Sequence, residues 1–248
     1  MEQLAAQGIA ALLVSLRIVP TFAFAPPFTF VRVPGLVRLL LSVSLAAWLV
    51  AGHPGQAARL DVSAGGLLVL AAAELLTGLA LSLSLMLAFA ALQTAGRAVD
   101  IQAGFGLATL VDPTTRAQMP LVGTLFAYAA GVIFFATGGP ADLLALWSAS
   151  LDQLPLGGAF RGDVGALTGY LSAVFVLAFG TVGLIMLVLF LIDLAVAFMS
   201  RTMPQMNVLL FGFQVKTLVT LLLLPITVAL ATSLLLRMLR LALDTALI

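Results

Sequence analysis

Long apolar stretches alternate with short polar breaks along the whole chain. Seven of them lie near residues 4–24, 36–51, 66–92, 119–137, 141–151, 164–199 and 217–243. Most are rich in Leu and Ala, which favour helix over strand. The pattern therefore predicts an all-α protein made of hydrophobic helices.

The lengths of these stretches differ in what they predict. A transmembrane helix needs about 20 apolar residues, and residues 67–92, 164–192 and 217–236 meet that length. The stretches 36–51 and 119–137 are marginal, and 141–151 is too short. Since residues 164–199 exceed one bilayer crossing, they predict either a long helix that passes the membrane edge or a broken helix.

Prolines and glycines separate the stretches. Pro20, Pro26, Pro27 and Pro34 lie in or before the first linker. Groups that contain both Pro and Gly interrupt the chain near residues 53–55, 138–140 and 155–158, and Asp112-Pro113 does so between them. Such residues end or kink helices. We therefore expect helical hairpins with broken or kinked long helices. The sequence contains no convincing internal repeat, which argues against an inverted-repeat transporter.

The composition limits the possible surroundings. Of the 248 residues, 62% are hydrophobic and only 8% are charged, whereas a soluble domain carries about 25% charged residues. The chain therefore needs a membrane or a large apolar assembly around it. A net charge of +1 gives no indication of a nucleic-acid partner.

Chemistry-bearing residues are few. The sequence has no cysteine and one histidine, His53, in a predicted turn. A solvated turn residue explains a lone loop histidine better than a catalytic or metal-binding role does. The sequence also lacks a His–Glu metal motif and a Gly-Lys-Ser/Thr phosphate loop. We expect no enzyme activity, no metal and no cofactor.

Two acidic residues stand in apolar surroundings. An ionised carboxylate at mid-membrane costs about 3 kcal/mol or more, so Glu74 is either an ion or proton site or a residue that hydrogen-bonds between helices or near the membrane edge. Asp193 and Arg201 are eight positions apart, too far for a direct pair within one helix. Partners for both on other chains are expected.

Basic residues gather early in the chain. Arg17, Arg32, Arg38 and Arg59 occur with no acidic residue between Glu2 and Asp61. The positive-inside rule would place the first linker in the cytoplasm. Two arginines near the C-terminus, at 237 and 240, argue for the same side.

A polar segment divides two of the most hydrophobic stretches. Residues 200–217 read SRTMPQMNVLLFGFQVKT, and a plain lipid-spanning bundle has little use for them. Either they contact other proteins, or they form a polar turn exposed at the membrane surface.

Three segments together resemble a known family. They are RIVPTFAFAPPFTFVRVPGLVRLLLSVSLA at 17–46, AGRAVDIQAGFGLATLVDPTTRAQMP at 95–120 and DLAVAFMSRTMPQMNVLLFGF at 193–213. In this order and spacing they resemble the FliR family of flagellar export-apparatus proteins, whose injectisome counterparts are called SctT. The resemblance covers nearly the whole chain, including Pro155-Leu156-Gly157-Gly158.

This resemblance implies a single FliR-like export-gate domain over residues 1–248. The chain would assemble with FliP-like and FliQ-like subunits and an FlhB-like export switch protein. The gated pore would pass unfolded flagellar substrates across the bacterial inner membrane at the flagellar basal body, in contact with lipid and without nucleic acid. Two alternatives stay open: the same gate role in a virulence injectisome, and a stand-alone secondary transporter or channel that uses Glu74 and Asp193.

The resemblance also implies a pore plug at residues 101–113. Glycines give a flexible backbone there, and apolar side chains could exclude water. Relatives often have Phe where this chain has Leu107 and Leu110. The plug residues expected are Gln102, Gly104, Phe105, Gly106, Leu107, Leu110, Asp112 and Pro113.

A subunit interface is expected around the polar segment, where residues 200–217 would form a bend between two long helices. Many relatives have proline where this chain has Gln214, so the bend after Phe213 would be softer. The interface residues expected are Glu74, Asp193, Arg201, Pro204, Gln205, Asn207, Gly212 and Phe213.

Overall fold

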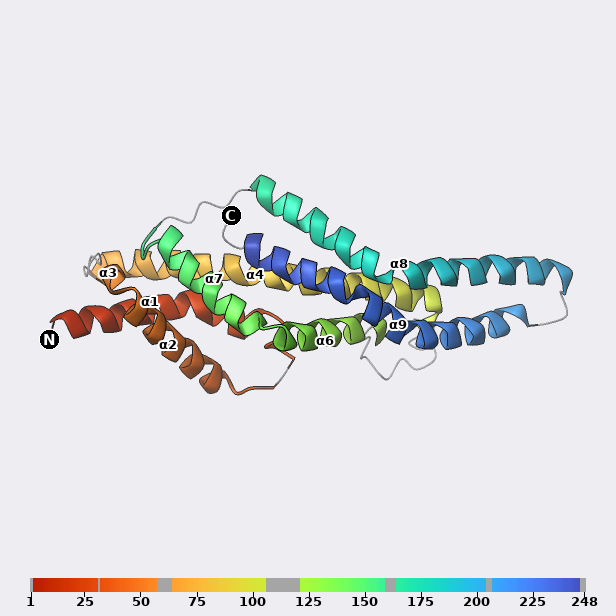
Figure 1. The fold of residues 1–248 in the computed structure, drawn as a ribbon, viewed down its shortest axis with the longest axis horizontal. Helices are drawn as coiled ribbons and strands as arrows, with labels where there is room; N and C mark the ends of the chain where they lie inside the picture. Colours follow the sequence, from red (N-terminus) through yellow and green to blue (C-terminus); the bar gives the residue numbers. More distant parts are fainter. Residues whose placement is uncertain are drawn as a thin grey trace. The chain divides into compact units, whose positions relative to one another are not determined.

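The structure is a computed structural model that describes residues 2–30, 32–57, 64–105, 121–158, 164–203 and 207–245. Over these residues the chain is helical and contains no strand. The helices are α1 (Glu2–Phe24), α2 (Gly35–Gly52), α3 (Pro54–Ala57), α4 (Ala64–Ala103), α6 (Leu121–Ala136), α7 (Gly139–Gln153), α8 (Val164–Thr202) and α9 (Val208–Thr245) (Figure 1). Each of the seven apolar stretches corresponds to a helix, so the all-α prediction is confirmed.

Five helices in the described residues are long and apolar enough to cross a membrane, judged by length and composition alone. The candidate spans are Ala5–Phe24, Gly35–Gly52, Gly66–Ala103, Gly165–Thr202 and Leu210–Ala229. The stretch 36–51, marginal in the sequence, is among them. The longest apolar run forms one uninterrupted helix of 39 residues, α8.

The predicted break between apolar stretches is present at α6 and α7. The two helices meet at an angle of 74°. Gly138 has φ +87°, a backbone conformation that favours glycine, and Pro140 lies in the first turn of α7, where a missing N–H costs nothing. Prolines also lie inside α1, at Pro20, and inside α9, at Pro225.

The predicted bend over residues 200–217 is wrong in its extent. Helix α8 ends at Thr202 and α9 begins at Val208, so Gly212 and Phe213 lie within a helix. Gln214, where many relatives have proline, lies inside α9 and keeps its backbone N–H. The break between the two helices is therefore only a few residues long.

The chain forms two compact units. Unit 1 consists of Met1–Leu87, Phe134–Tyr170 and Arg240–Ile248, and unit 2 of Ala88–Ile133 and Leu171–Leu239. In unit 1 an aromatic cluster fills part of the core, because the rings of Phe22 and Phe28 lie 4.8 Å apart and Phe22 also contacts Trp147. In unit 2 the fully buried side chains include Phe89, Leu92, Phe126, Ile185, Leu189 and Leu235.

Glycines let helices approach closely within each unit. In unit 1, a Cβ at Gly78 would lie 2.5 Å from the carbonyl oxygen of Arg17, so α4 packs directly against the backbone of α1. In unit 2, a Cβ at Gly96 would lie 2.2 Å from the Cα of Gly123, so α4 and α6 are in backbone contact. Small residues at such crossings are typical of helices packed in apolar surroundings, where close contact replaces the hydrophobic effect as the driving force.

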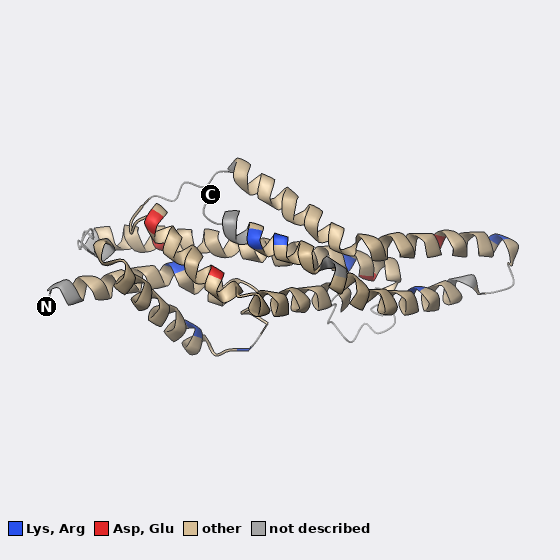
Figure 2. Cartoon of the chain, in the orientation of Figure 1, with Lys and Arg blue, Asp and Glu red and all other residues tan. Residues whose placement is uncertain are grey.

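Much of the described surface is apolar. Charged residues are sparse along the helices (Figure 2), while large apolar side chains such as Leu68, Leu187 and Phe198 are more than half exposed. A surface of this kind requires lipid or protein contacts.

We predict that the α4–α6 contact tolerates no side chain. Gly96→Ala should destabilise the purified chain by about 1–3 kcal/mol, because its methyl group meets the backbone of α6 rather than a side chain that can move. Thermal unfolding in mild detergent measures the effect. The matched control is Gly183→Ala in α8, where nothing lies within 4 Å and the helix should gain up to about 1 kcal/mol. Equal melting temperatures for the two variants would contradict the close contact.

Candidate functional site

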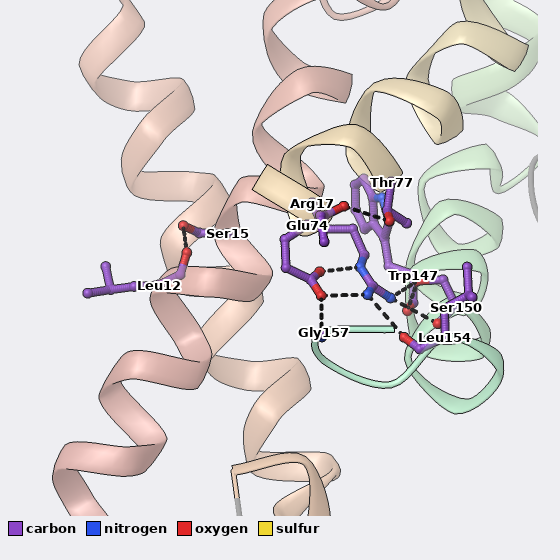
Figure 3. A network of polar contacts seen from close by, with 10 residues as sticks. Leu12, Ser15, Arg17, Glu74, Thr77, Trp147, Ser150, Leu154 and Gly157 are labelled. Atoms are coloured by element: carbon purple, nitrogen blue, oxygen red, sulfur yellow. Dashed lines mark hydrogen bonds and ion pairs between the residues drawn. The ribbon is translucent and has the colours of Figure 1, made fainter. Parts of the chain in front are cut away.

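A buried arginine lies at the centre of the most extensive polar cluster in unit 1 (Figure 3). Arg17 of α1 and Glu74 of α4 are each 1% exposed. Arg17 donates from Nε to Glu74 Oε2 at 2.7 Å and from Nη2 to Oε1 at 3.0 Å. This bidentate pairing matches the planar guanidinium to the carboxylate and is the strong form of an ion pair.

The remaining donors of Arg17 reach the end of α7 and the residues after it. Nη1 donates to the carbonyl oxygen of Ser150 at 2.9 Å and to its Oγ at 3.1 Å, and Nη2 donates to the carbonyl oxygen of Leu154 at 3.0 Å. A guanidinium has five N–H donors, and all five are used here. The backbone N–H of Gly157 donates to Glu74 Oε1 at 3.3 Å, which brings the Pro-Leu-Gly-Gly segment into the same cluster.

These contacts bear on the two readings of Glu74. Its carboxylate hydrogen-bonds between helices, which is one of the two roles considered from the sequence. Its partner Arg17 is 57 positions away, and no local sequence signal could pair the two. A contact of Glu74 with another subunit stays a prediction.

His53 belongs to a second polar group of unit 1. Its Nδ1 lies 2.8 Å from the carbonyl oxygen of Leu49, and its Nε2 lies 3.3 Å from Ser148 Oγ and 3.6 Å from Asp152 Oδ1. Serine and aspartate thus approach the same ring nitrogen. A serine nucleophile with a histidine base needs the acid on the opposite nitrogen, so this geometry does not form a catalytic triad.

In unit 2 a carboxylate of α4 receives the first turn of α6. Asp100, 5% exposed, accepts a hydrogen bond from the backbone N–H of Val122 at 3.0 Å and a longer one from Gly123 at 3.5 Å. The first N–H groups of a helix have no partner within the helix and carry a partial positive charge. Asp100 satisfies two of them, one helical turn beyond the close contact at Gly96.

The C-terminal end of α4 is held from two other helices. Gln102 donates from Nε2 to the carbonyl oxygen of Met186 in α8 at 3.1 Å. Lys216 of α9 donates from Nζ to the carbonyl oxygen of Gln102 at 3.2 Å and forms an ion pair with Asp193 of α8. A cation is favourable at the C-terminal end of a helix. Asp193 therefore has a partner within the chain, and its contact with another chain stays a prediction.

The predicted plug, residues 101–113, overlaps this anchoring, because Gln102 was expected in the plug and lies in the last turn of α4, bound to α8. Gly104 has φ +85°, a left-handed conformation that ends the helix and favours glycine, and Phe105 is half-buried. The remaining plug residues, Gly106, Leu107, Leu110, Asp112 and Pro113, lie outside the described residues.

The polar segment between α8 and α9 is described in part. Arg201 is exposed in the last turn of α8. Asn207 accepts the backbone N–H of Leu210 at 3.3 Å through Oδ1, as a helix N-cap does. A Cβ at Gly212 would lie 3.2 Å from Val196, so this glycine lies at the contact between α8 and α9.

Three other expectations for this segment have different outcomes. Phe213 is half-buried within α9. Pro204 and Gln205 lie outside the described residues.

The capping role of Asn207 could have been predicted from the sequence, because an Asn directly before an apolar run is an N-cap signal.

No group of three or more potential metal ligands occurs in the described part of the chain.

Sequence reasoning missed the anchoring roles of Arg17, Asp100 and Lys216. Arg17 and Asp100 lie inside the quoted family segments, but their partners are distant in the sequence, and only the packing of helices brings them together.

We predict that the Arg17–Glu74 pair acts as a unit. Glu74→Met should destabilise the chain by about 3–5 kcal/mol, because it leaves a buried guanidinium without its counter-charge. Arg17→Met should do the same, and the double variant should recover part of the loss. Thermal unfolding in detergent measures all three. Asp152→Ala in the same unit is the control, since its side chain is 67% exposed and loss of an exposed charge pair costs only about 0–1 kcal/mol. Additive losses in the double variant would contradict the pairing.

The chain is similar to proteins of bacterial export systems. The family model described as "Bacterial export proteins, family 1" matches residues 9–242. The flagellar biosynthetic protein FliR of Bacillus subtilis is 32% identical over 217 residues, which cover 85% of this chain and 83% of that protein.

Other relatives come from flagella and from secretion systems. The FliR protein of Escherichia coli is 28% identical over 200 residues, covering 80% of this chain and 76% of that protein. The Yop proteins translocation protein T of Yersinia pestis is 27% identical over 195 residues, covering 77% and 74%. The resemblance to the FliR and SctT family is therefore confirmed. With its family match extending over nearly its whole length, the chain belongs to the bacterial export proteins, family 1.

Proposed function

We propose that this chain is a subunit of the flagellar type III protein export gate. It would act as a single export-gate domain and assemble with FliP-like and FliQ-like subunits, with an FlhB-like export switch protein nearby. The assembly would form a gated pore in the bacterial inner membrane at the flagellar basal body and pass unfolded flagellar proteins.

The choice of the flagellar system over an injectisome rests on one relative with 32% identity. The FliR protein of Bacillus subtilis is 32% identical to this chain, whereas the Yop proteins translocation protein T of Yersinia pestis is 27% identical. The injectisome role remains the alternative within the same family.

The observation that carries the gate proposal is the anchoring on both sides of the predicted plug. At its first residues, Gln102 and Lys216 tie the end of α4 to α8 and α9. After it, the first turn of α6 is held by Asp100 of α4. A segment with both ends fixed to the same helices can move aside for a substrate and return to one place without rearranging those helices. Such anchoring suits a plug formed by residues 101–113.

The exposed apolar faces of α8 and α9 support assembly with other subunits. Phe190, Leu194 and Phe198 of α8 and Leu218 and Leu222 of α9 are each at least 45% exposed. Arg201 extends from the same end of α8 as Phe198, so a partner that covers this face would also meet a cation. We propose that Arg201, Pro204, Gln205 and Asn207 contribute polar contacts at this interface.

The stand-alone transporter has less support. It would use Glu74 and Asp193 as coupling sites, but Glu74 is bound by Arg17 and Asp193 is paired with Lys216 within the chain. A carboxylate held by a fixed cation is a poor site for a second cation.

We predict that the chain is recovered from native membranes as part of a large complex. An affinity-tagged chain extracted in mild detergent should bring along FliP-like and FliQ-like proteins, identified by mass spectrometry. Arg201→Ala should lower the yield of the complex, and Arg237→Ala, which removes another exposed arginine, should not. A stable, monodisperse chain recovered alone would overturn the gate proposal in favour of the transporter.

We predict that the apolar plug residues keep the resting gate closed. Replacing Phe105, Leu107 and Leu110 together with glycine should make the cytoplasmic membrane permeable to small solutes, because the water-excluding surface is lost. Uptake of a small membrane-impermeant dye measures the leak. The control carries Phe at 107 and 110, which keeps or enlarges the apolar surface and should stay tight. Unchanged permeability together with normal secretion in the glycine variant would reject the plug.

A further inference from the structure

An apolar cavity of about 350 Å³ lies in unit 1 between α1, α2, α7 and the segments next to them. One wall comes from a single face of α2 and the residues before it: Val33, Val37, Leu41 and Leu45 recur every four positions. The opposite wall includes Trp147 of α7. Since Val37 and Leu41 are 46% and 45% exposed, the cavity is open along α2.

The size and lining of this cavity suit a hydrocarbon chain. A methylene group is similar in size to a water molecule, which occupies about 30 Å³, so the cavity holds roughly a dozen methylenes. Eleven of its twelve lining residues are apolar, the exception being Arg38. A peptide segment would have to bury its backbone N–H and C=O groups without partners in such a cavity, whereas an acyl chain has no such groups.

The end of the cavity nearest the start of α2 is positively charged. Arg38 lines it and donates from Nη1 to the carbonyl oxygen of Ala23 at 3.4 Å, and Arg32, next to the lining residue Val33, is exposed. The first turn of α2 contains no acidic residue, and the partial positive charge of a helix N-terminus lies there as well. An anionic group is therefore favoured at this end.

Trp147 lines the cavity but exposes only 2% of its surface. Its Nε1 is buried, with no hydrogen-bond partner among the described residues, so a ligand in the cavity would contact the carbon atoms of this residue rather than its N–H. Trp147 therefore belongs to the apolar wall, and its fluorescence reports on what enters the cavity.

We propose that this cavity binds one acyl chain of an anionic phospholipid. The acyl chain lies along the α2 face, and the head-group phosphate lies near Arg32 and Arg38. Because α2 is long and apolar enough to cross a membrane, lipid is available along the open side. This lipid site is independent of the gate proposal.

Tryptophan fluorescence tests the site directly, because the chain has only two tryptophans. In the full-length Trp48→Phe variant, Trp147 is the sole reporter. This variant is placed in nanodiscs that contain either phosphatidylglycerol or phosphatidylcholine with brominated acyl chains, which quench indole fluorescence on contact. We expect Trp147 to lose most of its fluorescence at a low fraction of brominated phosphatidylglycerol and to need far more phosphatidylcholine for the same loss.

Three further variants separate the parts of the proposal. The midpoint is the fraction of brominated phosphatidylglycerol that halves the fluorescence of Trp147. Arg32→Gln with Arg38→Gln should raise this fraction roughly tenfold, toward the value for phosphatidylcholine. Arg32→Gln alone, at an exposed position, should shift it in the same direction without affecting the fold. Leu41→Phe, which narrows the open side, should restore the fluorescence of Trp147.

The exposed Trp48 is the control for contact with bulk lipid. In the Trp147→Phe variant, both brominated lipids should quench the fluorescence of Trp48 equally. If that variant fails to fold, the fluorescence of Trp48 is obtained by subtracting the signal of Trp48→Phe from that of the wild type. Undiminished Trp147 fluorescence in brominated lipid would overturn the proposal. Equal quenching by both lipids, unchanged by the arginine substitutions, would overturn the choice of an anionic lipid.

Discussion

A buried guanidinium whose donors are all occupied is the constraint on which unit 1 depends. Arg17 lies in the middle of an apolar helix, and an unpaired charge there would cost several kcal/mol. It needs a carboxylate from α4 and carbonyl oxygens from the end of α7 at the same time. Apolar side chains would accept many packings of these helices. The buried ion pair is compatible with only one packing, because all of its partners must be present together. It therefore contributes more to the specificity of the fold than to its net stability.

Unit 2 is organised by a different combination of constraints. Two glycines bring α4 and α6 into backbone contact, and one helical turn further on Asp100 satisfies the first N–H groups of α6. In apolar surroundings the hydrophobic effect hardly distinguishes one helix pairing from another, so close packing and polar contacts decide. Gln102 and Lys216 apply the same principle at the end of α4. The helix ends on both sides of the predicted plug are therefore the firmly held parts of this unit.

Three of the polar residues that were expected to contact other subunits make contacts within the chain. Glu74 and Asp193 have partners, and Asn207 caps α9. The surface left over is largely apolar, with a few exposed arginines such as Arg32 and Arg201. Contacts with lipid and with other subunits would then rest on shape and apolar area, and the arginines would add selectivity for anionic groups. This division explains how a chain with 8% charged residues can belong to a membrane-associated export system.

The sequence by itself determined the helical class, the positions of the helices and the family. Apolar stretches rich in Leu and Ala, separated by Pro and Gly, report on local structure, because helix formation depends on neighbouring residues. The same signal misjudged the segment 200–217, where α8 continues to Thr202 and α9 already begins at Val208. Only the tertiary structure decided that Glu74 pairs with Arg17, that Asp100 caps α6 and that Lys216 holds the end of α4. These contacts join residues that are 57, 22 and 114 positions apart. Local sequence patterns do not predict the helix packing that brings such distant residues together.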